Sequence, residues 1–260
     1  MARLNFSHAG DDYTYPEMCM GLVRNSQGAH YTLAGVDGIE IPANLRGVLV
    51  DTKGPEIRTG LLPSSAESME IEIGDSVVLT IKDVSGEEPS STPHMINVDY
   101  KSIAKSMKIG GFVLIDDGLI ELEVVTIDPN MESVTCVALN GGPVKKNKGV
   151  NLPGVELDLP ALTDKDKRDL KWSCEVGADY VAASFIRTAA NVRSVIAFLE
   201  RCIAELPEVE NGPPRLRPLV ISKIESKEGV DNFDAILKES DGIMVARGDL
   251  GVRDTLLRSL

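Results

Sequence analysis

The chain has 260 residues, of which 43% are hydrophobic and 26% are charged, and its formal net charge is -13. This balance is typical of a globular protein of one or two domains, and it argues against non-specific binding to nucleic acid or to an anionic membrane. The four cysteines are widely separated and the chain starts without an apolar leader, so we expect a cytoplasmic protein without a zinc ribbon or a disulfide framework.

The first elements in chain order predict the start of an α/β fold. Side chains alternate over residues 2–7, which predicts a strand with polar residues on one face. Residues 15–27 have a weak helical pattern. The continuous apolar run 47–51 ends in an acid and predicts a strand buried on both faces of a parallel sheet.

Residues 56–152 have almost no helical periodicity and predict a small all-β domain. Apolar residues alternate with polar ones over 69–73, continue over 77–81 and alternate again over 120–124. Gly/Asp and Asn/Gly turn signals separate these runs. Residues 85–93 predict an exposed loop.

Strand and helix patterns alternate again after residue 153. Strands are predicted over residues 180–185, 219–224 and 242–246. Thr188 predicts the N-cap of one helix, and a second helix is expected with Val230, Phe233, Ile236 and Leu237 on one side. This alternation indicates a parallel sheet, either doubly wound or a barrel, and the inserted all-β block makes that domain discontinuous.

Polar residues follow the predicted strands at their carboxyl ends, where active sites of parallel α/β folds form. Lys223 and Glu225 are two positions apart and share a face, and Asp249 follows the next strand. Two carboxylates can hold Mg²⁺ while a lysine stabilises charge on a phosphoryl group or an enolate. Taken alone, Lys223 and Glu225 fit a structural ion pair better than a catalytic metal site. With Asp249 at the next strand end, the two interpretations are about equally supported.

Further oxygen ligands and positive charge gather at the same predicted strand ends. Asn5, Ser7 and Asp51 offer hard oxygen ligands for K⁺ or Mg²⁺, although Asn5 and Ser7 alone fit capping or turn residues better. His8 by itself also fits a turn residue. Positive charge for phosphates is available from Arg3, Lys53, Arg58 and Arg247.

These strand ends resemble the signature segments of the pyruvate kinase family, in the same order, over residues 1–252. The similar segments are residues 2–8 (ARLNFSH), 49–60 (LVDTKGPEIRTG), 147–170 (NKGVNLPGVELDLPALTDKDKRDL), 179–187 (DYVAASFIR), 221–226 (ISKIES) and 242–251 (GIMVARGDLG). The combination of ISKIE and MVARGDLG is highly specific.

The resemblance implies an α/β fold, a partial TIM (β/α)8 barrel of the phosphoenolpyruvate/pyruvate type with an inserted all-β cap domain. We expect barrel residues at 1–54, the cap at 55–153, further barrel residues at 154–252 and a divergent tail at 253–260. Five of eight barrel strands are expected, without the first, seventh and eighth strands or the C-terminal domain of the family. The isolated chain is therefore expected to have little or no turnover and to tend to aggregate.

The resemblance also implies a reaction, the transfer of a phosphoryl group from phosphoenolpyruvate to ADP, which gives pyruvate and ATP in glycolysis. The cofactors are Mg²⁺ (or Mn²⁺) and K⁺, full-length members are homotetramers, and neither nucleic acid nor a membrane is an expected partner. Glu56 matches the glutamate of potassium-dependent members.

Residue by residue, the resemblance assigns the following roles. The catalytic residues are Lys223 and Arg3; Mg²⁺ ligands are Glu225 and Asp249; K⁺ ligands are Asn5, Ser7, Asp51 and Thr52; nucleotide and phosphate contacts are Arg3, His8 and Arg58; substrate contacts are Lys223, Gly248 and Asp249.

Two other functions remain open from the residues. The first is a Mg²⁺-dependent aldolase or lyase barrel that acts on pyruvate or oxaloacetate, although the inserted β domain and the Asn5/Ser7/Asp51 set argue against it. The second is a fragment that binds a ligand without turning it over.

Overall fold

A computed structural model describes residues 1–7, 10, 12–26, 32–34, 40–42, 46–86, 94–155, 157–207, 214–248 and 250. The chain divides into two compact units. The α/β unit comprises Met1–Pro55, Ala161–Ile224 and Asn232–Met244; the β unit comprises Glu56–Pro160, with which Glu225–Asp231 and Val245–Leu260 are grouped. Each unit is described separately.

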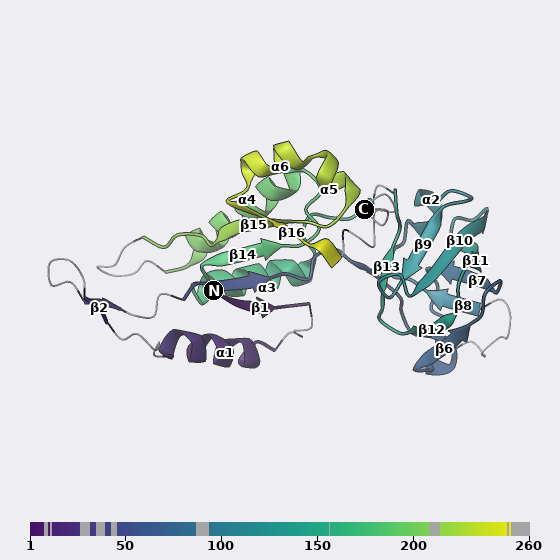
Figure 1. Ribbon diagram of the computed structural model, residues 1–260, viewed down its shortest axis with the longest axis horizontal. Coiled ribbons are helices and arrows are strands. Elements are labelled where there is room, and N and C mark those ends of the chain that lie inside the picture. Colours follow the sequence, from purple (N-terminus) through teal and green to yellow (C-terminus); the bar gives the residue numbers. More distant parts are fainter. Residues whose placement is uncertain are drawn as a thin grey trace. The chain divides into compact units, whose positions relative to one another are not determined.

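A five-stranded sheet of order β1-β4-β14-β15-β16 forms the centre of the α/β unit (Figure 1). The strands are β1 (Ala2–Asn5), β4 (Val48–Asp51), β14 (Tyr180–Ala183), β15 (Leu219–Ile224) and β16 (Gly242–Val245). The pairs β1–β4, β4–β14 and β14–β15 are parallel. The βα alternation of the sequence thus forms the predicted parallel sheet, with β1 and β16 at its edges within the described residues.

Helices cover one face of this sheet. Among the described residues, the helices of the α/β unit are α1 (Thr14–Asn25), α3 (Asp164–Glu175), α4 (Ala189–Glu205) and α6 (Phe233–Glu239). Helices α2 (Ile103–Ser106) and α5 (Lys227–Asp231) are grouped with the β unit. Val50 and Phe6 pack with Trp172 of α3 and Met20 of α1, and alternate residues of β14 and β15 pack with α3, α4 and α6. Because side chains alternate along a strand, Leu49 and Asp51 point to the opposite face.

Both long helices after the β unit begin with a reciprocal cap. The Thr163 hydroxyl accepts the backbone N–H of Asp166, and the Asp166 carboxylate accepts the backbone N–H of Thr163. Thr188 and Asn191 make the same exchange at the start of α4, so the N-cap predicted at Thr188 is confirmed. Each exchange satisfies two backbone donors that the first turn of a helix leaves open.

The predicted helix with Val230 and Leu237 on its apolar side is wrong as one element. The structure divides it into α5 and α6, separated by Asn232, whose side chain donates to the carbonyl of Arg187 at 3.0 Å. Ile236 is buried, whereas Val230 and Leu237 are exposed.

Several strand ends also differ from prediction. The first strand, expected over residues 2–7, ends at Asn5. The strand expected to continue to Phe185 ends at Ala183, because Phe185 adopts a left-handed backbone with φ of 57°. In the β unit, Ile73 was expected to follow Ile71 into a strand, but it is 74% exposed in the turn after β6.

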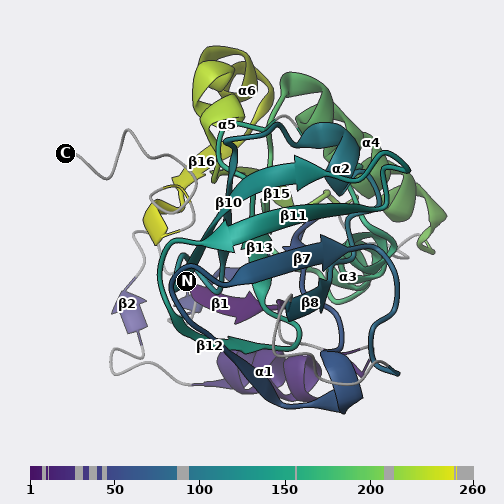
Figure 2. The same ribbon diagram turned by 90° about the vertical axis from the view of Figure 1, so that its right-hand side faces the viewer.

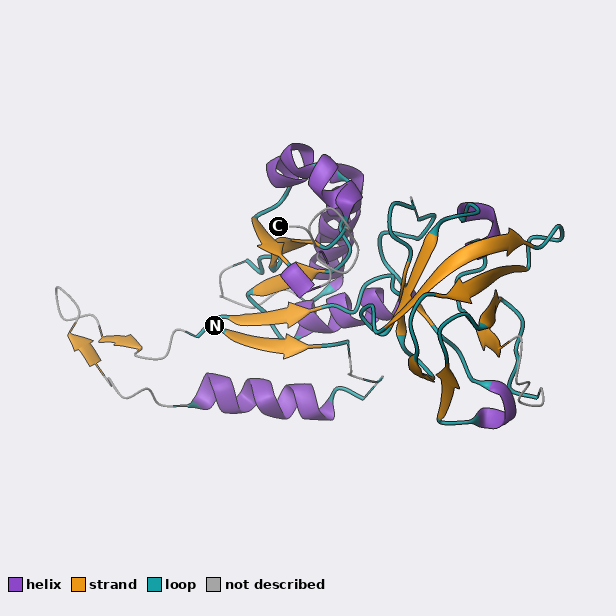
Figure 3. Cartoon of the chain, turned by 45° about the vertical axis from the view of Figure 1, so that its right-hand side comes forward, coloured by secondary structure: helices purple, strands orange, loops and turns teal. Residues whose placement is uncertain are grey.

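A seven-stranded sheet of order β5-β13-β9-β10-β11-β7-β8 forms the β unit (Figures 2 and 3). Its strands are β5 (Ile57–Arg58), β7 (Ser76–Thr80), β8 (His94–Asn97), β9 (Phe112–Ile115), β10 (Ile120–Ile127), β11 (Ser133–Ala138) and β13 (Gly149–Asn151). The smaller pairs in the chain are β6 (Ser68–Ile71) with β12 (Gly142–Lys145) and β2 (Thr32–Ala34) with β3 (Glu40–Pro42). A 3-10 turn lies at Pro63–Ser65.

The core of the β unit confirms the predicted alternation. Ile120, Leu122 and Val124 of β10 are fully buried, and they pack with Val77 and Leu79 of β7. Their polar neighbours point away, which is the pattern of a sheet with one buried face. Within the described part of the chain, no helix has the length and apolar character needed to cross a membrane.

An ion pair at the base of β15 and β16 makes a pH-dependent contribution to stability. The Asp241 carboxylate accepts Arg217 Nη1 at 2.6 Å and the backbone N–H of Val220 at 2.8 Å. The hydrogen bond from Arg217 holds the pKa of Asp241 below its usual range, and the backbone bond acts in the same direction while burial opposes it.

We expect Asp241→Asn to lower the free energy of unfolding of the α/β unit by about 1 kcal/mol at pH 7. Because the pKa of Asp241 is lower in the folded state, its ionised carboxylate stabilises that state at pH values above the unfolded-state pKa of about 3.9. This stabilisation is lost as the pH falls through the folded-state pKa. Urea unfolding followed by fluorescence of Trp172, the single tryptophan, measures this at pH 7 and at pH 3. An equal difference at both values would contradict the prediction.

Candidate functional site

Polar residues from four neighbouring strands meet at one edge of the sheet in the α/β unit. Asn5 is the register partner of Asp51, and Asp51 is the partner of Ala182 on β14. Ser184 follows β14 and Lys223 belongs to β15, which pairs with β14. The parallel sheet therefore brings together residues that are far apart in sequence.

A buried carboxylate lies between two cations at this edge. Asp51 is 1% exposed, and it accepts Arg3 Nε through Oδ2 at 2.7 Å and Lys223 Nζ through Oδ1 at 3.1 Å. Lys223 is 9% exposed, whereas Arg3 is half-exposed. Because burying an unpaired charge is costly, the two cations stabilise the buried carboxylate, and the carboxylate in turn holds the Lys223 ammonium in place.

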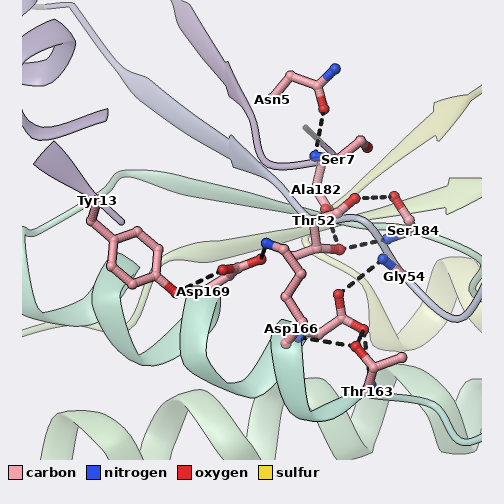
Figure 4. A network of polar contacts seen from close by, with 11 residues as sticks. Asn5, Ser7, Tyr13, Thr52, Gly54, Thr163, Asp166, Asp169, Ala182 and Ser184 are labelled. Carbon is pink, nitrogen blue, oxygen red and sulfur yellow. Dashed lines mark hydrogen bonds and ion pairs between the residues drawn. The ribbon is translucent and has the colours of Figure 1, made fainter. Parts of the chain in front are cut away.

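The Ser184 hydroxyl extends this arrangement to the segment after β4. Its Oγ donates to the carbonyl of Thr52 at 2.6 Å and accepts Lys223 Nζ at 2.9 Å. The backbone N–H of Ser184 donates to the Thr52 hydroxyl at 3.1 Å, and the Thr52 N–H donates to the carbonyl of Ala182 (Figure 4). These bonds tie the carboxyl ends of β4 and β14 together.

The start of α3 holds the next residues of the same segment. Asp166 is buried, and its Oδ1 accepts the backbone N–H of Gly54 at 2.9 Å while Oδ2 accepts the Thr163 N–H and hydroxyl (Figure 4). Gly54 has φ of +73°, and a Cβ there would lie 2.7 Å from the Cβ of Ser184. A glycine is therefore needed where this segment approaches the end of β14.

A second buried acid of α3, Asp169, has a different set of partners. Asp169 accepts the hydroxyl of Tyr13 at 2.8 Å (Figure 4), and it accepts Lys165 Nζ at 2.7 Å. Burial raises the pKa of the Asp169 carboxyl, and the hydrogen bonds from Lys165 and Tyr13 offset part of that rise. The ring of Tyr13 stacks on Trp172, so this contact anchors the segment before α1 onto α3.

Asn5, the last residue of β1, and Ser7 beyond it offer further side-chain oxygens. Asn5 Oδ1 accepts the backbone N–H of Ser7 at 3.1 Å (Figure 4), and Asn5 is exposed. With Asp51 as its register partner and the Thr52 carbonyl one residue further, the donor set consists of hard oxygens. Such oxygens suit an alkali or alkaline-earth cation.

The other predicted site residues divide as follows. His8 and Asp249 lie outside the described residues. Glu225 is 1% exposed. A Cβ on Gly248 would meet no atom of the described residues within 4 Å. Among the residues that the structure describes, no group of three or more His, Cys, Asp or Glu side chains is arranged to hold a metal ion.

Within the β unit, Arg58 lies on β5. Its guanidinium pairs with the Glu56 carboxylate and donates to the carbonyl of Asn147 at 2.6 Å. Glu56 thus has a cationic partner two residues along the chain.

Sequence reasoning grouped Lys223 with Glu225 and Asp249, and did not predict its contact with Asp51. The structure shows that contact and adds two residues to which no role was assigned, Ser184 and Asp166. The Thr163-x-x-Asp166 spacing was an available signal for the start of α3, because it is the pattern of a capping box.

Comparisons with known proteins agree on one family. The family model described as "Pyruvate kinase, barrel domain" matches residues 1–255, which confirms the expected partial barrel. A pyruvate kinase from Geobacillus stearothermophilus is 38% identical over 252 residues, covering 97% of this chain and 38% of the relative. Pyruvate kinases from Bacillus licheniformis (39% over 252 residues, 97% of this chain, 38% of the relative) and Staphylococcus aureus strain MRSA252 (37% over 257 residues, 97% of this chain, 37% of the relative) are similar. The chain thus spans less than two fifths of the length of these relatives.

Proposed function

This chain belongs to the pyruvate kinase family, and from this membership we propose that it carries the phosphoryl-transfer centre of such an enzyme. The reaction is transfer from phosphoenolpyruvate to ADP, giving pyruvate and ATP, in glycolysis and in the cytoplasm. The observation that supports the proposal is the buried ammonium of Lys223, held by Asp51 and Ser184 at the carboxyl end of the sheet.

The chemistry needs positive charge at a fixed place more than it needs a nucleophilic side chain. In phosphoryl transfer the charge spreads over the phosphoryl oxygens, so catalysis depends on positioning and electrostatic stabilisation. We assign this role to Lys223, which also stabilises the enolate that the transfer leaves. Arg3, His8 and Arg58 contact phosphate or nucleotide, and the backbone N–H groups of Gly248 and Asp249 bind the substrate carboxylate.

The donor groups fit the two cations that the family implies. Mg²⁺ (or Mn²⁺) would be held by Glu225 and Asp249, and would neutralise phosphoryl oxygens when bound. Glu225 is a buried carboxylate, and carboxylates are preferred ligands of Mg²⁺. K⁺ would be held by the hard oxygens of Asn5, Ser7, Asp51 and Thr52, of which Asn5 and Asp51 are register partners.

We propose slow turnover for the chain by itself. Catalytic residues of a (β/α) barrel come from the ends of several strands. The sheet of this chain supplies five strand ends, against eight in a complete barrel, so we expect a low rate. The edge strands β1 and β16 are the places where further pairing, or aggregation, would start. We propose the homotetrameric assembly of the family only for the full-length enzyme, and not for this chain by itself.

The proposed function is tested by pyruvate formation from phosphoenolpyruvate and ADP, with Mg²⁺ and K⁺ present. We expect a rate well below that of the Bacillus licheniformis relative, and a further loss of about 10²-fold in Lys223→Met, because removing one charge-stabilising donor typically costs that much. Ser173→Ala is a matched control, since the Ser173 hydroxyl bonds the carbonyl of Leu170 within α3.

Each alternative has its own outcome in this experiment. Pyruvate released from oxaloacetate without ADP would indicate a lyase. A melting temperature raised by phosphoenolpyruvate and Mg²⁺, with no product formed, would indicate a binding fragment. A rate that is equal in the unaltered chain and in Lys223→Met would contradict the assignment of Lys223.

A further inference from the structure

The Ser184 hydroxyl lies between two groups to which the proposed function gives separate tasks. Ser184 is buried, and its Oγ is 2.9 Å from Lys223 Nζ and 2.6 Å from the carbonyl oxygen of Thr52. Lys223 is the proposed charge-stabilising residue, and the Thr52 carbonyl is a proposed K⁺ ligand. One hydroxyl therefore bonds to both.

The donor and acceptor roles of this hydroxyl are determined by its partners. An ammonium group has only donors, so Ser184 Oγ must accept from Lys223. A hydroxyl has one proton to donate, and the Thr52 carbonyl at 2.6 Å is a closer acceptor than Asp51 Oδ1 at 3.5 Å. With its proton directed to Thr52, the hydroxyl presents its lone pairs to Lys223.

A lysine side chain needs a hydrogen-bond acceptor to fix its position more than a shorter side chain does. Its ammonium is carried on four flexible carbons and rotates freely unless acceptors hold it. Asp51 Oδ1 holds one N–H group of Lys223 at 3.1 Å, and Ser184 Oγ holds a second from the neighbouring strand end. Two acceptors from two strands define the position of the ammonium far better than one.

We propose that Ser184 is a positioning residue, which sets the place of the Lys223 ammonium and couples it to the Thr52 carbonyl. This inference rests on the proposed function for its kinetic consequence, whereas the immobilisation of Lys223 can be tested without turnover. A cation bound at Thr52 would then act on Lys223 through the Ser184 hydroxyl, in addition to its effect through Asp51.

The test follows Lys223 directly in the full chain, by carbon–proton correlation NMR with ¹³C-labelled lysine. A lysine held by two acceptors gives two separate Hε signals, and Lys223→Arg identifies them by their loss. We expect Ser184→Ala to reduce the separation of these two signals, because Asp51 still holds the ammonium. We expect KCl to shift the Lys223 signals less in Ser184→Ala than in the unaltered chain, because the path through Thr52 is then lost and the path through Asp51 is kept.

Ser222→Ala is the matched control. Ser222 precedes Lys223 on β15 and, like Ser184, is buried. It points to the face of the sheet opposite to that of Lys223, where its hydroxyl contacts that of Ser240. We expect this variant to keep separate Lys223 signals. In a second sample with ¹³C-labelled valine, the methyl signals of Val181 and Val220, which belong to the helix-side core, show whether either variant retains the sheet.

Kinetics gives the second readout. Where pyruvate formation is measurable, Ser184→Ala is expected to lower kcat about tenfold with less than about a twofold change in KM, because one hydrogen bond to a charged group is lost. Absence of turnover in every variant would overturn the proposed function and leave the NMR result to decide the role of Ser184. Unchanged Lys223 signals in Ser184→Ala, or equal loss in Ser184→Ala and Ser222→Ala, would overturn the positioning role.

Discussion

Asp51→Ala is expected to lower the free energy of unfolding of the α/β unit by about 3–5 kcal/mol. Asp51 is fully buried, and its two carboxylate oxygens face the cations of Arg3 and Lys223. Removing one partner of a buried ion pair leaves the other charge buried and uncompensated, and this typically costs about 3–5 kcal/mol. Here the buried ammonium of Lys223 would lose its contact with Asp51 Oδ1.

Urea unfolding followed by Trp172 fluorescence measures this effect, because Trp172 lies in the core of the α/β unit with Phe6 and Val50. Glu239→Ala is the matched control, since Glu239 makes an exposed pair with Arg193 at 2.8 Å and should cost less than about 1 kcal/mol. If Asp51→Ala cost no more than this control, the buried pair would contribute little to stability.

Gly54→Ala is the second change with a large expected effect, a loss of about 4 kcal/mol. The left-handed backbone at φ of +73° costs about 1–3 kcal/mol with any Cβ. The new atom would also lie 2.6 Å from a ring carbon of Phe185, and relieving such overpacking typically costs another ~1–3 kcal/mol. The strand ends carrying Thr52 and Ser184 would have to separate, so the Lys223 site is expected to be lost together with stability.

Gly21→Ala is the control for this prediction, in the same unit. Gly21 lies within α1, and a Cβ there would meet no atom within 4 Å in the part of the chain that the structure describes. Because alanine favours a helix over glycine, we expect this change to stabilise the unit by up to ~1 kcal/mol. Thermal melting of both variants, again followed by Trp172, gives the comparison. A melting temperature of Gly54→Ala equal to that of the unaltered chain would mean that the segment after β4 moves away without cost.

Local elements of this fold could be predicted because their signals lie within short stretches of chain. The run 219–224 forms β15 with the predicted limits, and Thr188 caps α4. Elements whose signal is weak or mixed were predicted less well. Helix α3 was not predicted, since its first turn is mostly charged and its buried face includes two acids, Asp166 and Asp169. Val230 and Leu237 misled the assignment of α5 and α6, because both are exposed.

The sequence predicted which residues belong to the candidate site better than it predicted which of them contact each other. Arg3, Asp51 and Lys223 were each identified at a strand end, and the structure places all three in one group. Their pairing was not predicted, because Asp51 was assigned to a cation together with Asn5 and Ser7. No pattern around Ser184 distinguishes it from any other serine that follows a strand.

The amino-acid sequence alone determined the family, the alternation of strands and helices, and the polar strand ends at which chemistry is expected. It could do so because periodicity and capping depend on burial and hydrogen bonding within one element. Only the tertiary structure decided that Asp51 lies between Arg3 and Lys223, which are 48 and 172 positions away. That outcome depends on the strand order β1-β4-β14-β15-β16 and its register, which arise from pairing between distant segments and leave no local signal in the chain.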